Sequence, residues 1–251
     1  MSRRARGGCR RARALGLALL LAGTAPGVAG AAALEGLGGW EGDGFGQGYG
    51  FLALGAIIPA RSNASIMVRA QASYLYYDFE SSGATTRVIS PGATLLAGVR
   101  FAGERGSLAL AGGGEARRER RQPPAPAAET WDTPTGGVGQ LEADAALAPR
   151  WHVTLIANYA GAARYLFSRA ALRWQATNPD WSRPTTMTCG LELTGQGNDE
   201  TRGVQGGALA DLALVPRRLS LAVHGGYKDA WSPGERHRRG AYFGAGFYRR
   251  F

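Results

Sequence analysis

The chain has 251 residues, 39 of them glycine, and its 29 basic and 19 acidic residues give a formal net charge of +10. So positive a charge would suggest a nucleic-acid partner, but six of the arginines lie within the first 13 residues. With only two cysteines and three histidines, the chain lacks the usual ligands of a dedicated metal site.

The N-terminal 31 residues have the order of a secretory signal peptide. The six arginines precede an apolar stretch, Ala14–Ala22, and a small-residue run, Val28–Ala33. A membrane-anchoring helix is the alternative, but it needs about 20 predominantly apolar residues, and this run is shorter. Cleavage after residue 31 removes the six arginines and Cys9, which leaves a net charge of +4 and Cys189 as the remaining cysteine. We therefore expect no nucleic-acid partner and no internal disulfide in residues 32–251.

From residue 34 onward, apolar and polar residues alternate over stretches of 9 to 13 residues that are separated by Gly, Asn, Asp, Ser, Pro and Arg. In Ser65–Tyr77, for example, Ile66 and Val68 share one face while Arg69 and Gln71 share the other. A period of two predicts β-strands whose faces meet different surroundings. Eleven candidates are centred near residues 53, 71, 95, 111, 142, 155, 170, 191, 209, 223 and 246. Bacterial barrels have even strand numbers, and Leu34–Asp43, which contains Trp40, supplies a twelfth.

Alternation also fits a soluble β-sandwich, but three features favour a transmembrane barrel. The strands have the length of a tilted bilayer crossing. Links alternate in length as in outer-membrane barrels: the periplasmic links include Ala60–Ala64, Ala102–Gly106, Ala148–Arg150 and Val215–Arg218, and the external ones include Asp78–Thr86, Arg118–Gly136 and Asp229–Arg239. Aromatic residues sort into two belts, with Tyr74, Tyr76, Tyr159, Tyr227 and Phe243 at the outer level and Phe101, Trp151, Trp174 and Phe251 at the periplasmic level.

These patterns predict an all-β fold, a transmembrane antiparallel up-and-down β-barrel of about 12 strands formed by residues 32–251 in the outer membrane of a Gram-negative bacterium. Eight or ten strands remain possible if weak glycine-rich segments lie outside the wall. The last strand carries Phe243, Phe247 and the terminal Phe251 on one face, as in the C-terminal signal read by the barrel-assembly machinery. Arg249 departs from that pattern, and an ordinary amphipathic strand ending in Phe is the alternative.

The inward faces of the predicted strands carry both signs of charge: Arg69, Arg100, Glu115, Arg117, Glu142, Asp144, His152, Arg169, Arg173, Glu192, Asp211, His224 and Lys228. Charges that face a restricted interior need partners, so an ion-pair network that fills or narrows the lumen is the first interpretation. A charge-selective solute path, or a site for an anionic glycan, is the second.

Catalysis is not expected. His152, Thr154 and Asn158 share a face, but Thr154 stands where the motif of the outer-membrane phospholipases has Ser. His224 and Asp211 form a possible base and orienting pair, yet no nucleophile lies at a recognisable spacing. Gly112–Gly114 is not a phosphate loop because no helix follows. We expect no cofactor.

Four stretches resemble the BcsS family of cellulose-biosynthesis accessory barrels: GATLLAGVRF (92–101), LALAGGGEARRERR (108–121), GLELTGQGNDETRGVQGGALADL (190–212) and RRGAYFGAGFYRRF (238–251). The resemblance rests on strand and glycine rhythm, and it transfers no functional residues. It implies a non-enzymatic role in secreting or anchoring a β-glucan.

The sequence therefore predicts an accessory outer-membrane barrel for cellulose or exopolysaccharide biosynthesis. A small porin or plain structural barrel is the alternative, and a membrane-embedded hydrolase is a third possibility. The expected partners are outer-membrane lipid and lipopolysaccharide, the barrel-assembly machinery, and components of polysaccharide or cellulose synthesis.

Overall fold

The computed structural model describes residues 32–81, 83–124, 128–177, 185–232 and 237–251. The predicted signal peptide, residues 1–31, lies outside the described residues. Strands and one short 3-10 helix form the described chain: β1 (Ala33–Asp43), β2 (Gly48–Pro59), β3 (Ala64–Ser81), β4 (Ala84–Gly103), β5 (Gly106–Arg117), β6 (Glu119–Gln122), β7 (Thr130–Asp132), β8 (Thr135–Ala148), β9 (Trp151–Ala160), β10 (Tyr165–Gln175), β11 (Thr185–Gly197), β12 (Arg202–Leu214), η1 (Val215–Arg217), β13 (Leu219–Trp231) and β14 (Arg238–Arg250).

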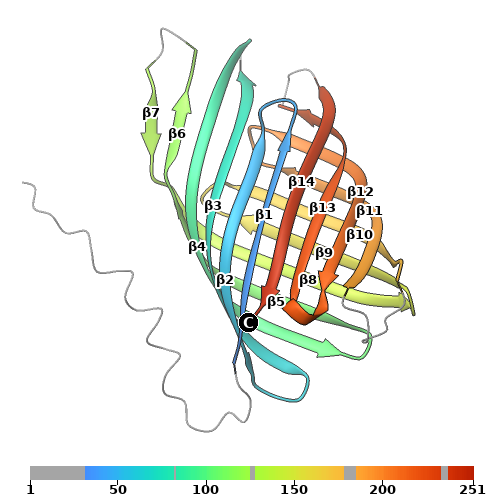
Figure 1. Ribbon diagram of the computed structural model, residues 1–251. Coiled ribbons are helices and arrows are strands. Elements are labelled where there is room, and N and C mark those ends of the chain that lie inside the picture. The colour runs from blue at the N-terminus through green and yellow to red at the C-terminus, as the bar shows by residue number, and fades with distance from the viewer. Residues whose placement is uncertain (1–31, 82, 125–127, 178–184, 233–236) are drawn as a thin grey trace, which may run out of the picture.

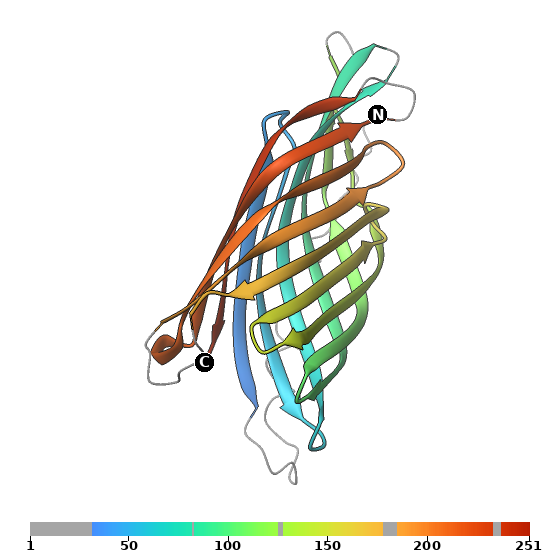
Figure 2. The same cartoon turned by 90° about the vertical axis from the view of Figure 1, so that its right-hand side faces the viewer.

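Twelve of the fourteen strands close into one antiparallel barrel, in which β8 follows β5 and β14 pairs with β1. Figures 1 and 2 show these long strands tilted around a common axis. Closure leaves no free sheet edge in the wall, as a bilayer requires of a β-structure. The predicted twelve-stranded transmembrane barrel is confirmed, with Leu34–Asp43 as part of its first strand. Among the described residues, no helix is long and apolar enough to span a bilayer.

The alternating sequence places apolar side chains on the outside of the barrel. Leu54, Leu191 and Leu193 are all at least 60% exposed, and hydrocarbon would cover them in a membrane. Trp151 and Trp174, predicted for the periplasmic belt, are direct cross-strand partners and both are exposed on this outer wall. Tyr159, Tyr227 and Phe243 of the predicted outer belt are likewise exposed.

The links that were expected to be long external loops are shorter than predicted, because strands extend into them. Residues 78–86 were expected to form an external loop, but β3 runs to Ser81 and β4 starts at Ala84. The prediction was wrong because polar residues there still pair across the hairpin, as Asp78 does with Arg87 through a 2.9 Å ion pair. In residues 229–239, β13 likewise continues to Trp231 and β14 begins at Arg238.

The predicted external loop 118–136 also contains strands, because β6 pairs with β7 and with the upper part of β4. Figure 1 shows this hairpin beyond the barrel wall, away from the end that holds the C-terminus. Turns of two to four residues connect β4 to β5, β8 to β9 and β12 to β13 at the C-terminal end. We refer to that end as the periplasmic end, because at the other end the long strands β3 and β4 and the β6–β7 hairpin extend beyond the wall, as the extracellular parts of outer-membrane barrels do.

Candidate functional site: the barrel lumen

An ion triad around the buried side chains of Arg69 and Glu35 crosses the lumen. The guanidinium of Arg69 on β3 lies 3.1 Å from Glu35 on β1 and 2.7 Å from Glu142 on β8. Tyr248 on β14 donates a 3.2 Å hydrogen bond to Glu35, and Gln140 donates a 2.7 Å bond to Glu142. Because the partners come from separate walls, these contacts span the space that an open pore would leave empty.

A second buried network joins β1, β10, β11, β13 and β14. Arg169 lies 2.6 Å from Glu41 and 3.6 Å from Glu192. His224 Nδ1 lies 2.9 Å from Glu192 Oε1, and the Tyr242 hydroxyl donates to the same oxygen at 2.8 Å. The His224 ring packs closely over Gly244, its cross-strand partner on β14, because an added methyl group there would overlap the ring.

Closer to the outer end, the lumen is packed with both polar and apolar side chains. Lys228, the only lysine in the chain, lies 2.7 Å from Asp43 and 3.1 Å from the Gln47 side-chain oxygen, and it is almost fully buried. Leu75, Tyr77 and Val88 form an apolar cluster in the same half of the barrel, with Tyr49 and Phe79 packed against it. Buried charge with matched partners and apolar packing together exclude bulk water from this part of the lumen.

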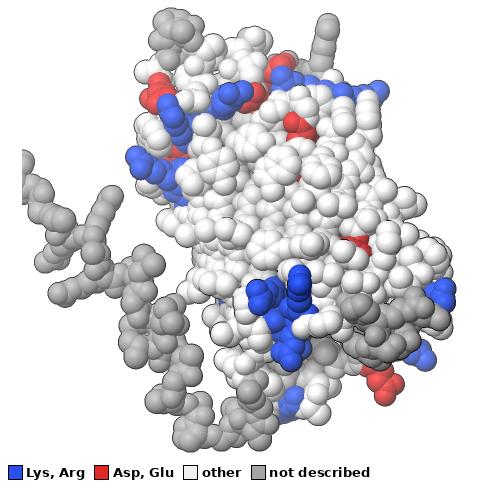
Figure 3. Space-filling model, in the orientation of Figure 1, with Lys and Arg blue, Asp and Glu red and all other residues white. Residues whose placement is uncertain are grey.

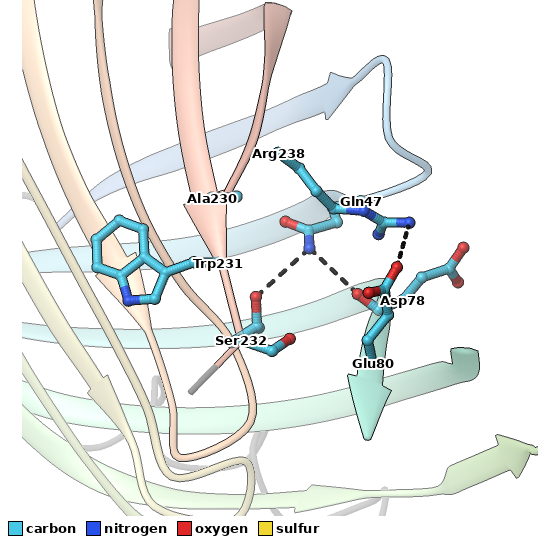
Figure 4. Close-up of a pocket in the computed structure, with 8 residues that line it drawn as sticks. Gln47, Asp78, Glu80, Ala230, Trp231, Ser232 and Arg238 are labelled. Carbon is cyan, nitrogen blue, oxygen red and sulfur yellow. Dashed lines mark hydrogen bonds and ion pairs between the residues drawn. The ribbon is translucent and has the colours of Figure 1, made fainter. Parts of the chain in front are cut away.

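A small pocket at the outer rim shows how tightly this end is closed. Figure 4 shows Gln47 between Asp78 and the end of β13, and its amide donates to the Asp78 carbonyl at 3.3 Å and to Thr201 Oγ1 at 3.4 Å. Arg238 and Glu80 form a 3.4 Å ion pair across the same pocket. The cavity measures about 10 Å³, which is room for about one water molecule and too little for a sugar ring.

The periplasmic half of the lumen is more open. Arg173 pairs with Asp211 and donates a 3.2 Å hydrogen bond to Thr154, while His152 lies 3.8 Å from Asp144. The Asp144 side chain is 44% exposed, against 1% for Glu192 in the second network. Even the inward-facing Ile156 is 37% exposed. The lumen is therefore a cup that opens toward the periplasmic end.

Comparison with known families agrees with this architecture. A family model described as "Cellulose biosynthesis protein BcsS" matches residues 29–251, which is most of the chain. The chain belongs to the BcsS family. A search of curated proteins found no match for this BcsS-family chain.

Solved outer-membrane barrels share the fold of the BcsS-family chain. The beta domain of the Bordetella autotransporter Brka is 16% identical, with a TM-score of 0.54 over 88% of this chain and 99% of that one. The translocator domain of autotransporter NalP from Neisseria meningitidis is 13% identical, with a TM-score of 0.51 over 87% of this chain and 88% of that one. At these identities the likeness concerns the fold alone.

The structure of this BcsS-family chain separates the predicted lumen residues into groups. Arg69 and Glu142 form the triad with Glu35. Arg169, Glu192 and His224 form the second network, and Arg173, Asp211, His152 and Asp144 line the open cup. Arg117 donates to Ser90 at 2.9 Å and lies 3.5 Å from Glu115. Arg100 is half-buried near the periplasmic end of β4.

Neither candidate catalytic arrangement forms a recognisable hydrolase site. His224 contacts Glu192 instead of Asp211, whose ion-pair partner is Arg173. Thr154 accepts a hydrogen bond from that same Arg173. Among the described residues, no group of three or more His, Cys, Asp or Glu side chains is arranged to hold a metal ion.

The carboxylates of β1 were missing from the predicted lumen set. Glu35, Glu41 and Asp43 supply partners to Arg69, Arg169 and Lys228. The signal was present in the sequence, because these residues alternate with Leu34 and Trp40, which are exposed on the outer wall. Phe243, Phe247 and Phe251 are also exposed on that wall, and their role in barrel assembly stays a prediction.

Proposed function

We propose that this BcsS-family chain is a non-enzymatic accessory barrel of the outer membrane that holds or guides cellulose or a related exopolysaccharide at the cell surface. Membership of the BcsS family and the outer-membrane fold support a role in cellulose biosynthesis. The single observation that favours an anchor over a conducting pore is the closure of the lumen. Thr194, Gln205 and Val88 are each at most 1% exposed inside the barrel.

Closure on this scale is difficult to reconcile with a glucan passing through the described barrel. A chain would have to displace the Arg169–Glu41 pair and the Arg69–Glu35 pair together. Breaking one buried pair alone costs several kcal/mol when a charge is left without its partner. We therefore place the polysaccharide outside the barrel, where the strand extensions of the outer end would face it.

A deletion strain tests the proposal when cell-associated and released polysaccharide are measured separately. We expect the total polymer to be nearly unchanged and the cell-associated fraction to fall, because an anchor retains polymer that other components make. Complementation with the intact gene should restore the fraction. An unchanged distribution of polymer in the deletion strain would contradict the proposal.

Single-channel recording in planar bilayers separates the anchor from a small porin. We expect the purified barrel to show little or no steady conductance, since its outer half is filled. As the matched variant, Arg169→Ala combined with Tyr242→Ala removes two side chains of the second network and should raise the conductance. Large, stable channels in the unaltered protein would favour the porin.

A further inference from the structure

An apolar groove lies on the outer wall where β1 closes against β14. It measures about 620 Å³ and is lined by Trp40, Gly50, Leu52, Tyr74, Leu221 and Phe247, among others. The groove exists because outward positions on these strands hold glycine: Gly38 lies between Leu52 and Phe247, and Gly50 lies opposite Trp40. A smooth lipid-facing wall would carry larger side chains there.

Four arginines gather at the periplasmic end of this groove. Arg217 and Arg218 form the turn between β12 and β13, and Arg249 and Arg250 end β14. The backbone holds them together, because the Arg250 amide donates to the Arg218 carbonyl at 3.0 Å and Arg249 is the cross-strand partner of Leu219. Figure 3 shows a blue patch near the C-terminal end below a largely uncharged surface.

These arginines have no anionic partner in the described part of the chain. Among the described residues, no carboxylate forms an ion pair with any of the four. Arg217 and Arg218 lie in a turn, and Arg249 and Arg250 lie at a strand end. Arg249 stacks over the Phe251 ring at 4.8 Å, which holds it on the outer face. The exposed guanidinium groups of Arg217, Arg218 and Arg249 at a membrane boundary attract anionic headgroups, and each can bind phosphate through two parallel hydrogen bonds.

The groove and the arginines are continuous along one outer face. Arg249 follows Phe247 by two residues on β14, so both side chains lie on the same side of the sheet. Arg249 is also the cross-strand partner of Gly36, two residues from Gly38 in the groove. A molecule with an acidic head and apolar tails fits this order of surfaces.

We propose that this face is a binding site for an anionic glycerophospholipid of the periplasmic leaflet. The phosphodiester contacts Arg217, Arg218 and Arg249, and the acyl chains lie in the groove between Leu52, Leu221 and Phe247. The site rests on the membrane placement of the barrel and is independent of the polysaccharide role. A bound lipid there would cover the seam at which the first and last strands close the barrel.

Native mass spectrometry of the purified barrel tests this site after reconstitution with equal amounts of phosphatidylglycerol and phosphatidylethanolamine. We expect the intact protein to retain phosphatidylglycerol preferentially. Arg217→Gln combined with Arg218→Gln should weaken that preference by more than about tenfold, because one basic residue near a membrane surface contributes about fivefold. Arg217→Lys with Arg218→Lys keeps the charge and should retain most of the preference. Equal retention by the Gln variant would overturn the proposal.

Groove filling separates a lipid site from a site for phosphate alone. At Gly50 the nearest side-chain atom to an added Cβ is Trp40 Cδ1 at 3.5 Å, so Gly50→Leu should fit and should reduce retention of both lipids. The matched control is Gly139→Leu, which fills another outer-wall groove, of about 540 Å³, where an added Cβ meets nothing within 4 Å. That variant should leave retention unchanged.

Two results would contradict the proposal that acyl chains lie in the groove. One is equal loss of lipid in Gly50→Leu and Gly139→Leu, which would indicate general annular lipid. The other is displacement of phosphatidylglycerol by millimolar inorganic phosphate with no effect of Gly50→Leu, which would indicate a headgroup site without tails. A shift in gel mobility between boiled and unboiled samples shows that each variant is folded.

Discussion

The outer and periplasmic halves of the lumen are built from the same strands yet solve the problem of inward charge differently. In the closed part of the lumen, charges are buried and meet partners from other strands, as Lys228 meets Asp43 and Arg69 meets Glu35. In the periplasmic half, pairs such as His152 and Asp144 are looser and keep contact with solvent. Solvent access is therefore what should determine how much each charge contributes to stability.

The largest effect is expected where a buried charge loses its partner. Arg69→Ala leaves Glu35 buried without a counter-ion, and we expect it to lower the free energy of unfolding by about 3–5 kcal/mol. Urea unfolding in detergent micelles, followed by tryptophan fluorescence, measures the change. Arg69→Met combined with Glu35→Leu removes both buried charges and should recover most of the loss. A small effect of Arg69→Ala would mean that water reaches Glu35.

Apolar packing inside the barrel offers the next comparison. Leu96 is only 2% exposed in the closed part of the lumen, whereas Ile156 faces the same lumen but is 37% exposed. Leu96→Ala should cost about 2–5 kcal/mol because it leaves a cavity, and Ile156→Ala should cost clearly less because water fills the vacated space. The same urea titration tests both variants. Equal losses would show that the cup is closed in solution.

The ion pair of the periplasmic cup should contribute less than the buried Arg69–Glu35 pair. Arg173 and Asp211 are only partly buried, and solvent-screened pairs contribute about 1 kcal/mol or less. We expect Arg173→Ala to stay within that range in the same unfolding assay. Adding 1 M NaCl should reduce the difference between this variant and the unaltered protein, since salt screens exposed pairs more than buried ones. A loss as large as that of Arg69→Ala would remove the distinction between the two halves.

Much of this architecture could be predicted from the sequence because alternation records two different solvents. The strand count followed from that pattern, and Leu34–Asp43 was placed in the wall by the requirement for an even number. The pattern also assigned Arg69, Glu142 and Glu192 to inward positions. Their partners are a different matter, because Arg69 meets a carboxylate 73 residues away, and that meeting depends on the tilt and stagger with which the barrel closes.

The contacts that close one part of the lumen and leave the other open could not be predicted either, because they also depend on tilt and stagger. His224 and Asp211 were expected to form a pair because they lie on adjacent strands. The register instead places Leu209 opposite His224, and the His224 side chain contacts Glu192. The β6–β7 hairpin was also missed, because its polar residues have no apolar face to mark them as strand. Only the backbone pairing with β4 reveals it.

The smallest effect is expected in the exposed β6–β7 hairpin, where a charge pair outside the lumen should change local structure without changing the stability of the barrel. In the link before β7, a hydrogen bond from Arg120 holds the pKa of Glu129 below its ordinary value. A lowered folded-state pKa stabilises the hairpin above the ordinary glutamate pKa of about 4.3, and this contribution disappears as the pH falls through the lower value.

Trp131, on which Arg118 and Arg120 stack, reports the change. Its fluorescence should therefore shift on acidification below about pH 4.3, and Glu129→Gln should abolish the shift while urea stability stays unaltered. Loss of barrel stability over the same pH range in the Gln variant would place the titrating group in the lumen instead of the hairpin.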